Sequence, residues 1–323
     1  MEPDALTADG GRIGTAVRRV LRGCGVAVML GLVAGPVVAR AQDHCGERGE
    51  PAPGLLMSAE WLKRHRADSG LVILQVERSR APYDSAHVAA AQFISTSDFT
   101  TRRGDILTEL PEVPQLQALF ESLGIGDTGR IVLYGEILPV TRLFFTLDYL
   151  GLGDRVSVLD GGLAAWSAAR GEIAVTAAPP AERRTLTVHP RPALVADAAW
   201  VLAHRKSKDV LLLDTRSKEE FDGTKPEEGV ARPGHIPGAV HFDWTTTVAD
   251  GRFREQGELR RLFTAAGATA GKEVVTYCRV GTRASAVYFA ARLLGYRVRL
   301  YDGSMNEWSS RRELPVVGPK GKP

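Results

Sequence analysis

The chain has 323 residues, of which 44% are hydrophobic and 24% are charged, and its formal net charge is +3. This length predicts about two domains, and the composition is ordinary for a globular protein. So small a net charge, with no run of lysines, argues against nucleic acid as a partner. Three cysteines are too few for a fold held together by disulfides.

The first 41 residues have the pattern of a secretory signal peptide. Three arginines between positions 18 and 22 form a positive flank, an apolar stretch covers 25–38, and Ala39-Arg40-Ala41 supplies a small-x-small cleavage signal. The apolar stretch is short for a membrane span, which leaves an uncleaved anchor as the alternative. We therefore expect cleavage after about Ala41, export to the periplasm and no stable membrane insertion afterwards, by either the general or the twin-arginine route.

Residues 42–54 are predicted to be a flexible segment. They contain His44 and Cys45, but no second pair of ligands has metal-binding spacing. We expect neither a metal nor another cofactor, and the role of Cys45 stays open.

The rest of the chain repeats itself once, at an offset of about 140 residues, which indicates a duplicated domain rather than a solenoid. The matched segments are 72–79 with 211–217, 86–91 with 234–239, 131–134 with 274–277, and 157–162 with 299–304.

Each copy alternates short apolar runs with helical patterns. Strands are predicted at 210–213 and 274–277, and helices at 256–266 and 284–294, the second ended by Gly295. This alternation predicts an α/β fold in which each domain is a parallel sheet with helices on both faces. The predicted layout is domain one at 55–171, a proline-rich linker at 172–195, domain two at 196–315 and a frayed tail at 316–323.

One cysteine stands where such a fold places reactive groups. Cys278 follows the predicted strand that ends at Tyr277 and precedes a predicted helix. A turn of this kind aims backbone N–H groups and the positive end of the helix at the sulfur, which favours the thiolate. Arg279 and Arg283 add positive charge, so the sequence predicts a reactive sulfur beside an anion site.

The second copy resembles the catalytic domain of the two-domain sulfurtransferases of the rhodanese family. The resemblance rests on Leu-Asp-Thr-Arg at 213–216, Gly-Thr-Lys-Pro-Glu at 223–227, Gly-His-Ile-Pro-Gly-Ala at 234–239, Cys-Arg-x-Gly at 278–281 and Tyr-Asp-Gly-Ser at 301–304. The first copy is similar to the family's non-catalytic domain. Gly135 stands there in the place of Cys278, so the resemblance implies tandem rhodanese-like domains of which only the second is catalytic.

The resemblance also implies the reaction. The thiolate of Cys278 would take the outer sulfur of thiosulfate as a persulfide and pass it to cyanide or to a thiol acceptor such as a small redox protein. Backbone N–H groups of Arg279, Val280, Gly281, Thr282 and Arg283 would bind the anionic donor. Both arginine side chains would also contact its oxygens.

A further donor contact is implied for Arg142. It stands in Thr-Arg-Leu-Phe-Phe at 141–145, where the family has a donor-binding arginine followed by aromatic residues. The alternative is an arginine exposed on a helix.

Mercaptopyruvate is the alternative donor. Relatives that use it have a serine two positions after the cysteine, joined in a triad with an aspartate and a histidine. Val280 and Gln75 stand at the first two of these positions and only His87 remains, whereas Arg279 is typical of the thiosulfate branch.

Two other classes of function remain as alternatives: a cysteine-dependent phosphatase and a non-catalytic sulfur-binding module. Phosphatases of related fold place five residues between cysteine and arginine, but four separate Cys278 from Arg283. His235 is expected to hold its loop by bonding to backbone or to Asp214, and Asp214 to pair with Arg216. We expect the protein to be a monomer.

Overall fold

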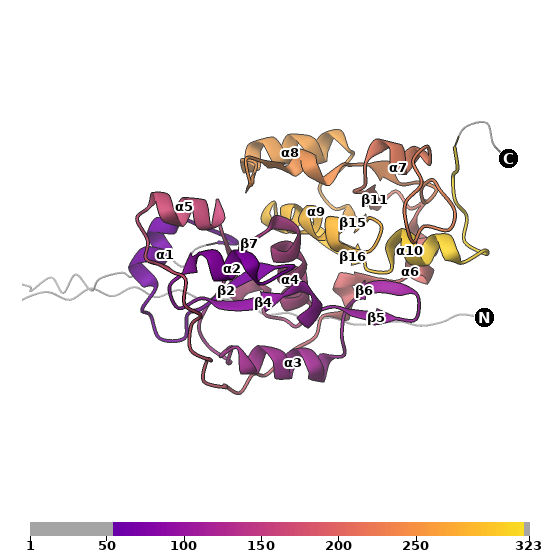
Figure 1. Ribbon diagram of the computed structural model, residues 1–323. Coiled ribbons are helices and arrows are strands. Elements are labelled where there is room, and N and C mark those ends of the chain that lie inside the picture. The colour runs from indigo at the N-terminus through magenta and orange to yellow at the C-terminus, as the bar shows by residue number, and fades with distance from the viewer. Residues whose placement is uncertain (1–53, 320–323) are drawn as a thin grey trace, which may run out of the picture. The chain divides into compact units, whose positions relative to one another are not determined.

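The computed structural model describes residues 54–319 (Figure 1). The predicted signal peptide, its cleavage point and Cys45 lie outside these residues. None of the helices within 54–319 is long and apolar enough to cross a membrane.

The duplication predicted from the sequence is visible as two five-stranded parallel sheets with the same order of strands. The first sheet has the order β1 (Leu56–Met57), β8 (Val156–Leu159), β7 (Ile131–Gly135), β2 (Val72–Glu77) and β4 (Gln92–Ser95). The second has the order β10 (Val195–Ala196), β16 (Arg297–Tyr301), β15 (Glu273–Tyr277), β11 (Val210–Asp214) and β12 (Val240–His241).

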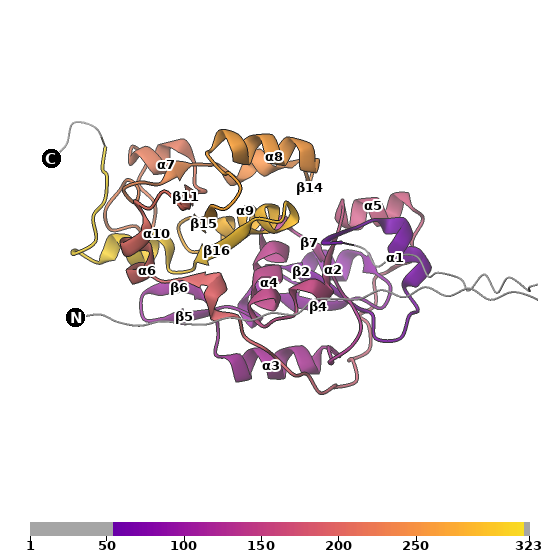
Figure 2. The same cartoon turned by 180° about the vertical axis from the view of Figure 1, so that it is seen from behind.

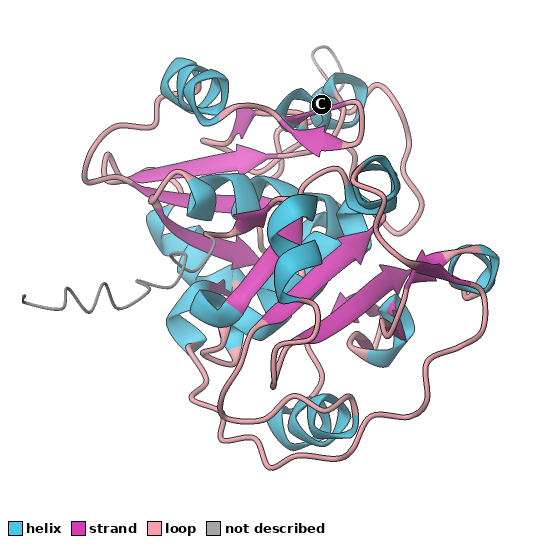
Figure 3. Cartoon of the chain, turned by 90° about the vertical axis from the view of Figure 1, so that its left-hand side faces the viewer, coloured by secondary structure: helices cyan, strands magenta, loops and turns pink. Residues whose placement is uncertain are grey.

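Helices cover both sheets, as expected for parallel strands, which need both faces buried (Figure 3). The first domain has α1 (Ala59–His65), α2 (Ala81–Ser85), α3 (Val113–Ser122), α4 (Ile137–Tyr149) and α5 (Gly162–Ala168). The second has α6 (Ala198–His204), α7 (Lys218–Asp222), α8 (Gln256–Ala265), α9 (Thr282–Leu293) and α10 (Ser304–Ser310). Short 3₁₀ turns occupy Thr96–Asp98, Gly153–Arg155, Pro192–Leu194 and Trp244–Thr247.

Three small antiparallel pairs complete the fold. They are β3 (His87–Val88) with β9 (Ile173–Ala174), β5 (Thr101–Arg103) with β6 (Ile106–Glu109), and β13 (Val248–Ala249) with β14 (Arg252–Phe253). The pairs β5–β6 and β13–β14 are hairpins, one in each domain.

The two domains belong to one compact unit and meet through α4 and α9 (Figures 1 and 2). Both helices are buried along most of their length because each packs on its own sheet and on the other helix. Phe144 lies edge-on to Phe289 with ring centres 4.8 Å apart, and Phe145 lies similarly against Tyr288 at 5.1 Å. A buried Asp148 accepts hydrogen bonds from Tyr288 and Arg292, which ties the helices together.

The segments predicted as linker and tail are more ordered than expected. In the connecting segment, β9 pairs with β3 and Leu186 is buried in the core of the first domain. Past the second domain, Val317 forms an antiparallel bridge with His235, so the chain does not fray directly after Leu314. The buried side chain of Leu186 explains the first difference, and the backbone hydrogen bonds of Val317 to His235 explain the second. The prediction relied on prolines and chain position.

Candidate active site

The candidate site begins where the central strand of the second sheet ends. Tyr277 closes β15, Thr282 opens α9, and Cys278–Gly281 form the loop between them. Gly281 has φ +80°, and a Cβ there would lie 2.7 Å from Oδ1 of Asp302. Only glycine therefore suits this position, and the tight turn brings the loop back over the carboxyl end of the sheet.

Ser304, at the start of α10, holds the loop from below. Its Oγ accepts the backbone N–H groups of Cys278 at 3.2 Å and Gly281 at 3.1 Å, and its hydroxyl donates to the carbonyl of Tyr301. The N–H of Gly281 was expected to bind the donor, but it is occupied by this hydroxyl. Ser304 was not singled out from the sequence, although it belongs to the recognised Tyr-Asp-Gly-Ser segment.

Four backbone N–H groups of the loop remain open. Those of Arg279, Val280, Thr282 and Arg283 have no acceptor within residues 54–319. They follow Cys278 directly in the chain, at the amino end of the 12-residue helix α9, whose dipole adds a positive partial charge. This arrangement can bind an anion next to Cys278.

The two arginines of the loop have different environments. Arg283 pairs with Glu220 at 2.7 Å and with Glu227 at 2.5 Å. Although burial opposes its charge, the electrostatic interactions around it, those with Glu220 and Glu227 among them, raise its pKa. Its guanidinium is thus largely neutralised by carboxylates, and the direct donor contact expected of its side chain is not supported by this pairing.

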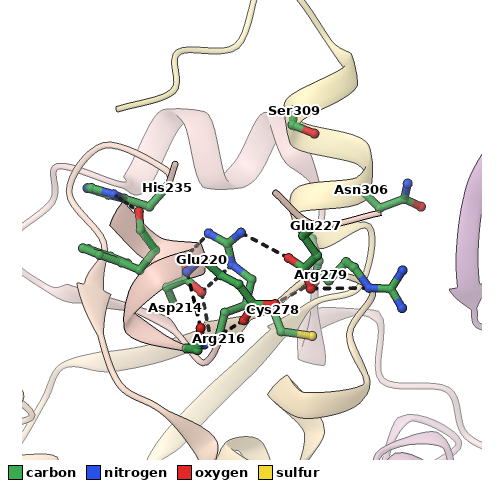
Figure 4. Close-up of polar contacts among 12 residues, drawn as sticks. Asp214, Arg216, Glu220, Glu227, His235, Cys278, Arg279, Asn306 and Ser309 are labelled. Carbon is green, nitrogen blue, oxygen red and sulfur yellow. Dashed lines mark hydrogen bonds and ion pairs between the residues drawn. The ribbon is translucent and has the colours of Figure 1, made fainter. Parts of the chain in front are cut away.

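Arg279 is freer. Its Nη1 donates to the carbonyl of Glu228 at 3.1 Å, its Nε lies 3.5 Å from Oε1 of Glu227, and 31% of its side chain is exposed (Figure 4). Arg279 is therefore the guanidinium of the loop best able to turn toward an anionic ligand.

The pKa of Glu220 is lowered by its surroundings, whereas that of Glu227 is raised. Burial acts to raise the pKa of Glu220, but the hydrogen bond from Arg283 prevails and the pKa falls to about 2. Burial raises the pKa of Glu227 above its ordinary value. The carboxylate of Glu227 lies between Arg279, Arg283 and Arg216, so it links the loop to the core of the second domain (Figure 4).

Cys278 lies at a pocket of about 410 Å³ that both domains line. Its side chain is fully buried from bulk solvent, and it is the free cysteine of the described chain. The other lining residues are Glu227, Arg279, Val280, Thr282 and Arg283 from the second domain, and Arg78, Thr96, Thr108, Leu138 and Pro139 from the first.

Arg142 is not among the residues that line this pocket. Its buried guanidinium makes two hydrogen bonds to the carboxylate of Asp302, the longer at 3.0 Å, and another to the carbonyl of Thr108. This position beneath Gly281 differs from both expectations, since Arg142 is neither exposed nor directed at the pocket. The motif at 141–145 pointed to an arginine near the reactive loop. It did not reveal that this arginine pairs with Asp302 of the other domain.

The β5–β6 hairpin of the first domain clamps the loop from above. Thr108 donates its hydroxyl to the carbonyl of Val280, and the N–H of Leu107 donates to Oδ1 of Asn306 at 2.9 Å. Asn306 in turn donates its backbone N–H to the carbonyl of Arg279. The loop conformation therefore depends on both domains, a feature that no local sequence pattern reveals.

His235, Asp214 and Arg216, which were expected to have structural roles, make contacts of that kind. His235 stacks on Phe221 and bonds through Nδ1 to the carbonyl of that residue at 2.8 Å, rather than to Asp214. Asp214 pairs with Arg216 at 2.6 Å, as expected. No group of three or more His, Cys, Asp or Glu side chains within 54–319 could hold a metal ion.

The remnants of the mercaptopyruvate triad do not meet. Gln75 bonds to Tyr134 and Glu77 inside the first domain, and His87 bonds to the carbonyl of Tyr83. Neither lines the pocket of Cys278, whereas Val280 does.

Comparison with known proteins now decides the family. The model of the rhodanese-like domain matches twice, at residues 58–169 and 197–311. The chain belongs to the rhodanese family.

Other members of the family are similar over most of the chain. The sulfur carrier protein TtuD of Thermus thermophilus is 32% identical over 285 residues, which cover 83% of this chain and 98% of that one. SseA of Mycobacterium tuberculosis, provisionally named a thiosulfate sulfurtransferase, is 33% identical over 82% of this chain and 91% of its own.

A solved structure of EanB agrees with the fold. A variant of EanB that carries a cysteine persulfide and is bound to ergothioneine superposes with a TM-score of 0.74. It is 25% identical, and the match covers 82% of this chain and 70% of that one. This rhodanese-family protein is accordingly similar in sequence to proteins named as sulfurtransferases, and similar in fold to EanB.

Proposed function

We propose that this rhodanese transfers sulfane sulfur from thiosulfate to cyanide or a thiol through a persulfide on Cys278. The observation that carries the proposal is the position of Cys278 in a pocket beside four open backbone N–H groups and Arg279. A nucleophilic sulfur and an anion site in contact are what thiosulfate, a small dianion with an electrophilic outer sulfur, requires.

In the first step, the thiolate of Cys278 attacks the outer sulfur of thiosulfate. A sulfur–sulfur bond forms to Cys278, the original bond to the sulfonate sulfur breaks, and its electron pair leaves with sulfite. The open N–H groups and Arg279 would stabilise the negative charge that moves onto the departing oxygens.

In the second step, cyanide or a thiolate attacks the outer sulfur of the persulfide. The bond between the outer sulfur and Cys278 breaks, and its electron pair returns to the Sγ of Cys278, which becomes a thiolate again. The name of TtuD, a sulfur carrier protein, supports a thiol on another protein as the acceptor and makes relay of sulfur the second candidate function.

Intact-mass analysis tests the first step. Incubation with thiosulfate should add one sulfur atom to the wild-type protein, and cyanide should then remove it as thiocyanate. The Cys278→Ser variant should show neither change. Absence of the adduct together with hydrolysis of p-nitrophenyl phosphate would overturn the proposal in favour of a phosphatase, and 3-mercaptopyruvate used in place of thiosulfate would correct the donor.

The protein is further proposed to act in the periplasm, to which the predicted signal peptide would direct it. It is also proposed to be a monomer, since one chain supplies both walls of the pocket. Mass spectrometry of the protein purified from its own cells should find a new N-terminus at Gln42. An intact Met1 would refute cleavage, and light scattering that gives twice the mature mass would refute the monomer.

A further inference from the structure

The first domain has a pocket of its own, of about 400 Å³, at the carboxyl edge of its sheet. Gly135 lines it at the end of β7, as Cys278 lines the other pocket after β15. Ligands of open parallel sheets bind at this edge, and the volume is within the range of small-molecule sites. Duplication has thus left a cavity in the domain without a reactive cysteine.

The walls of this first-domain pocket are mostly apolar. Leucine, isoleucine, valine, proline and phenylalanine side chains form them, among them Leu56, Pro82, Ile137, Val140, Leu163 and Phe253. Gly162 adds space, because a Cβ built there meets nothing within 4 Å. An apolar molecule would therefore gain free energy by leaving water for this pocket.

The charge at the bottom of the pocket is opposite to that at Cys278. Glu77, at the end of β2, is only 6% exposed and lines the pocket. Its Oε1 accepts from Gln75 at 3.2 Å and its Oε2 from the backbone N–H of Glu136, just before α4, at 3.4 Å. A buried carboxylate thus stands where the second domain presents open N–H groups, so an anion is excluded and a cation is favoured.

The second domain closes the rim of the first-domain pocket. Gly251, Arg252 and Phe253 of the β13–β14 hairpin line it, and Arg252 pairs with Asp160 at 3.2 Å. Because Arg252 and Asp160 offset each other, Glu77 is left as the unbalanced charge. No arginine, lysine or histidine within 54–319 forms an ion pair with Glu77, and burial raises the pKa of its carboxyl.

We propose that the first-domain pocket binds a small apolar molecule that carries an ammonium group, with the ammonium against the carboxylate of Glu77. The apolar part lies among the side chains from α4, α5 and the β13–β14 hairpin. This binding does not depend on sulfur transfer at Cys278, so either proposal can fail without the other.

Isothermal titration calorimetry with benzylamine tests the proposal, with benzyl alcohol and benzoate as aromatic probes of similar size but different charge. The wild-type protein should bind benzylamine saturably, benzyl alcohol more weakly and benzoate not at all. Glu77→Gln keeps the volume and removes the charge, and should weaken benzylamine by about tenfold or more while changing benzyl alcohol little.

Two further variants locate the site. Ala86→Phe places a ring in the first-domain pocket from its rim and should abolish binding of both benzylamine and benzyl alcohol. Cys278→Ala should bind both as the wild type does. Each variant is first compared with the wild type by melting temperature, so that loss of folding is recognised.

The proposal is overturned if benzylamine gives no saturable heat up to about 10 mM, the weakest affinity expected of so small a ligand. Equal binding to wild type and Glu77→Gln would also overturn it, as would binding that is lost in Cys278→Ala.

Discussion

The two domains have the same strand order but connect their central strand to the next helix differently. Four residues, Cys278–Gly281, separate β15 from α9, whereas Glu136 alone separates β7 from α4. The longer loop leaves backbone N–H groups open for an anion, whereas the N–H of Glu136 donates a hydrogen bond to the carboxylate of Glu77. The reactive site thus differs from its counterpart by a whole loop, so a cysteine at Gly135 would not reproduce it.

The contacts between the domains are reciprocal but unequal. An aspartate follows β16 and β8 alike, and each pairs with an arginine of the other domain: Asp302 with Arg142, and Asp160 with Arg252. The first pair is buried and lies beneath the reactive loop, and the second is exposed at a rim. The buried connection between the domains therefore lies on the side of the reactive loop.

The largest effect expected is that of Cys278→Ser. Removal of the nucleophile should lower turnover of thiosulfate by more than roughly a thousandfold and leave the melting temperature nearly unchanged. Steady-state assay of thiocyanate and a thermal melt measure both. Retained activity would mean that the described loop is not the reactive one and would turn attention to Cys45.

The next effect concerns the crossed ion pairs. Arg142→Met leaves Asp302 buried without its partner and should cost about 3–5 kcal/mol of unfolding free energy. Arg252→Met breaks the exposed pair and should cost about 0–1 kcal/mol. Urea unfolding of the two variants gives the comparison directly, and similar losses would show that the domains meet more symmetrically than the burial indicates.

Ser304→Gly removes the hydroxyl that holds the reactive loop, at a backbone position, φ +49°, that glycine adopts readily. We expect kcat/KM for thiosulfate to fall by about tenfold to a hundredfold, because the N–H groups and the sulfur lose their fixed geometry.

The matched control for Ser304→Gly is Gly162→Ser, which places a serine at the corresponding position of the first domain, φ +53°. It should leave kcat/KM unchanged. A parallel fall in both variants would indicate a general loss of packing rather than a role for the Ser304 hydroxyl.

The smallest effect is a dependence of stability on pH. Glu109, on the hairpin that clamps the loop, has its pKa raised from 4.5 to about 7, first by burial and next by Asp302. The folded protein therefore binds this proton more tightly than the unfolded chain, and stability should fall as pH rises from about 4.5 to about 7.

Glu109→Gln should remove this part of the pH dependence and make the protein more stable than wild type at pH 8 by about 1–2 kcal/mol. Urea unfolding at pH 5 and pH 8 measures the difference. A variant that is equally destabilised at both pH values would contradict the assignment.

Local patterns were sufficient to predict the sheets, the duplication and the position of Cys278, because strand and helix periodicity and the turn after Tyr277 are encoded by neighbouring residues. The partners of the loop could not be predicted in this way. Ser304 and Asp302 follow β16, the strand that pairs with β15, so strand pairing within the second domain brings them to the loop. Thr108 comes from the first domain, and its contact depends on the packing of α4 against α9. The same packing explains why Arg142, although in a recognisable motif, meets an aspartate instead of the pocket.

Each domain contributes a hairpin to the pocket region of the other domain, β5–β6 in one direction and β13–β14 in the other. This has a consequence for any attempt to divide the protein. Cut at the connecting segment, the carboxy-terminal half would lose one wall of its pocket and the support above Val280, and the apolar side of α9 would meet water. Such a fragment should aggregate or bind a second copy of itself long before it turns over substrate. The domain that has no reactive cysteine is therefore needed for the structure of the one that has it.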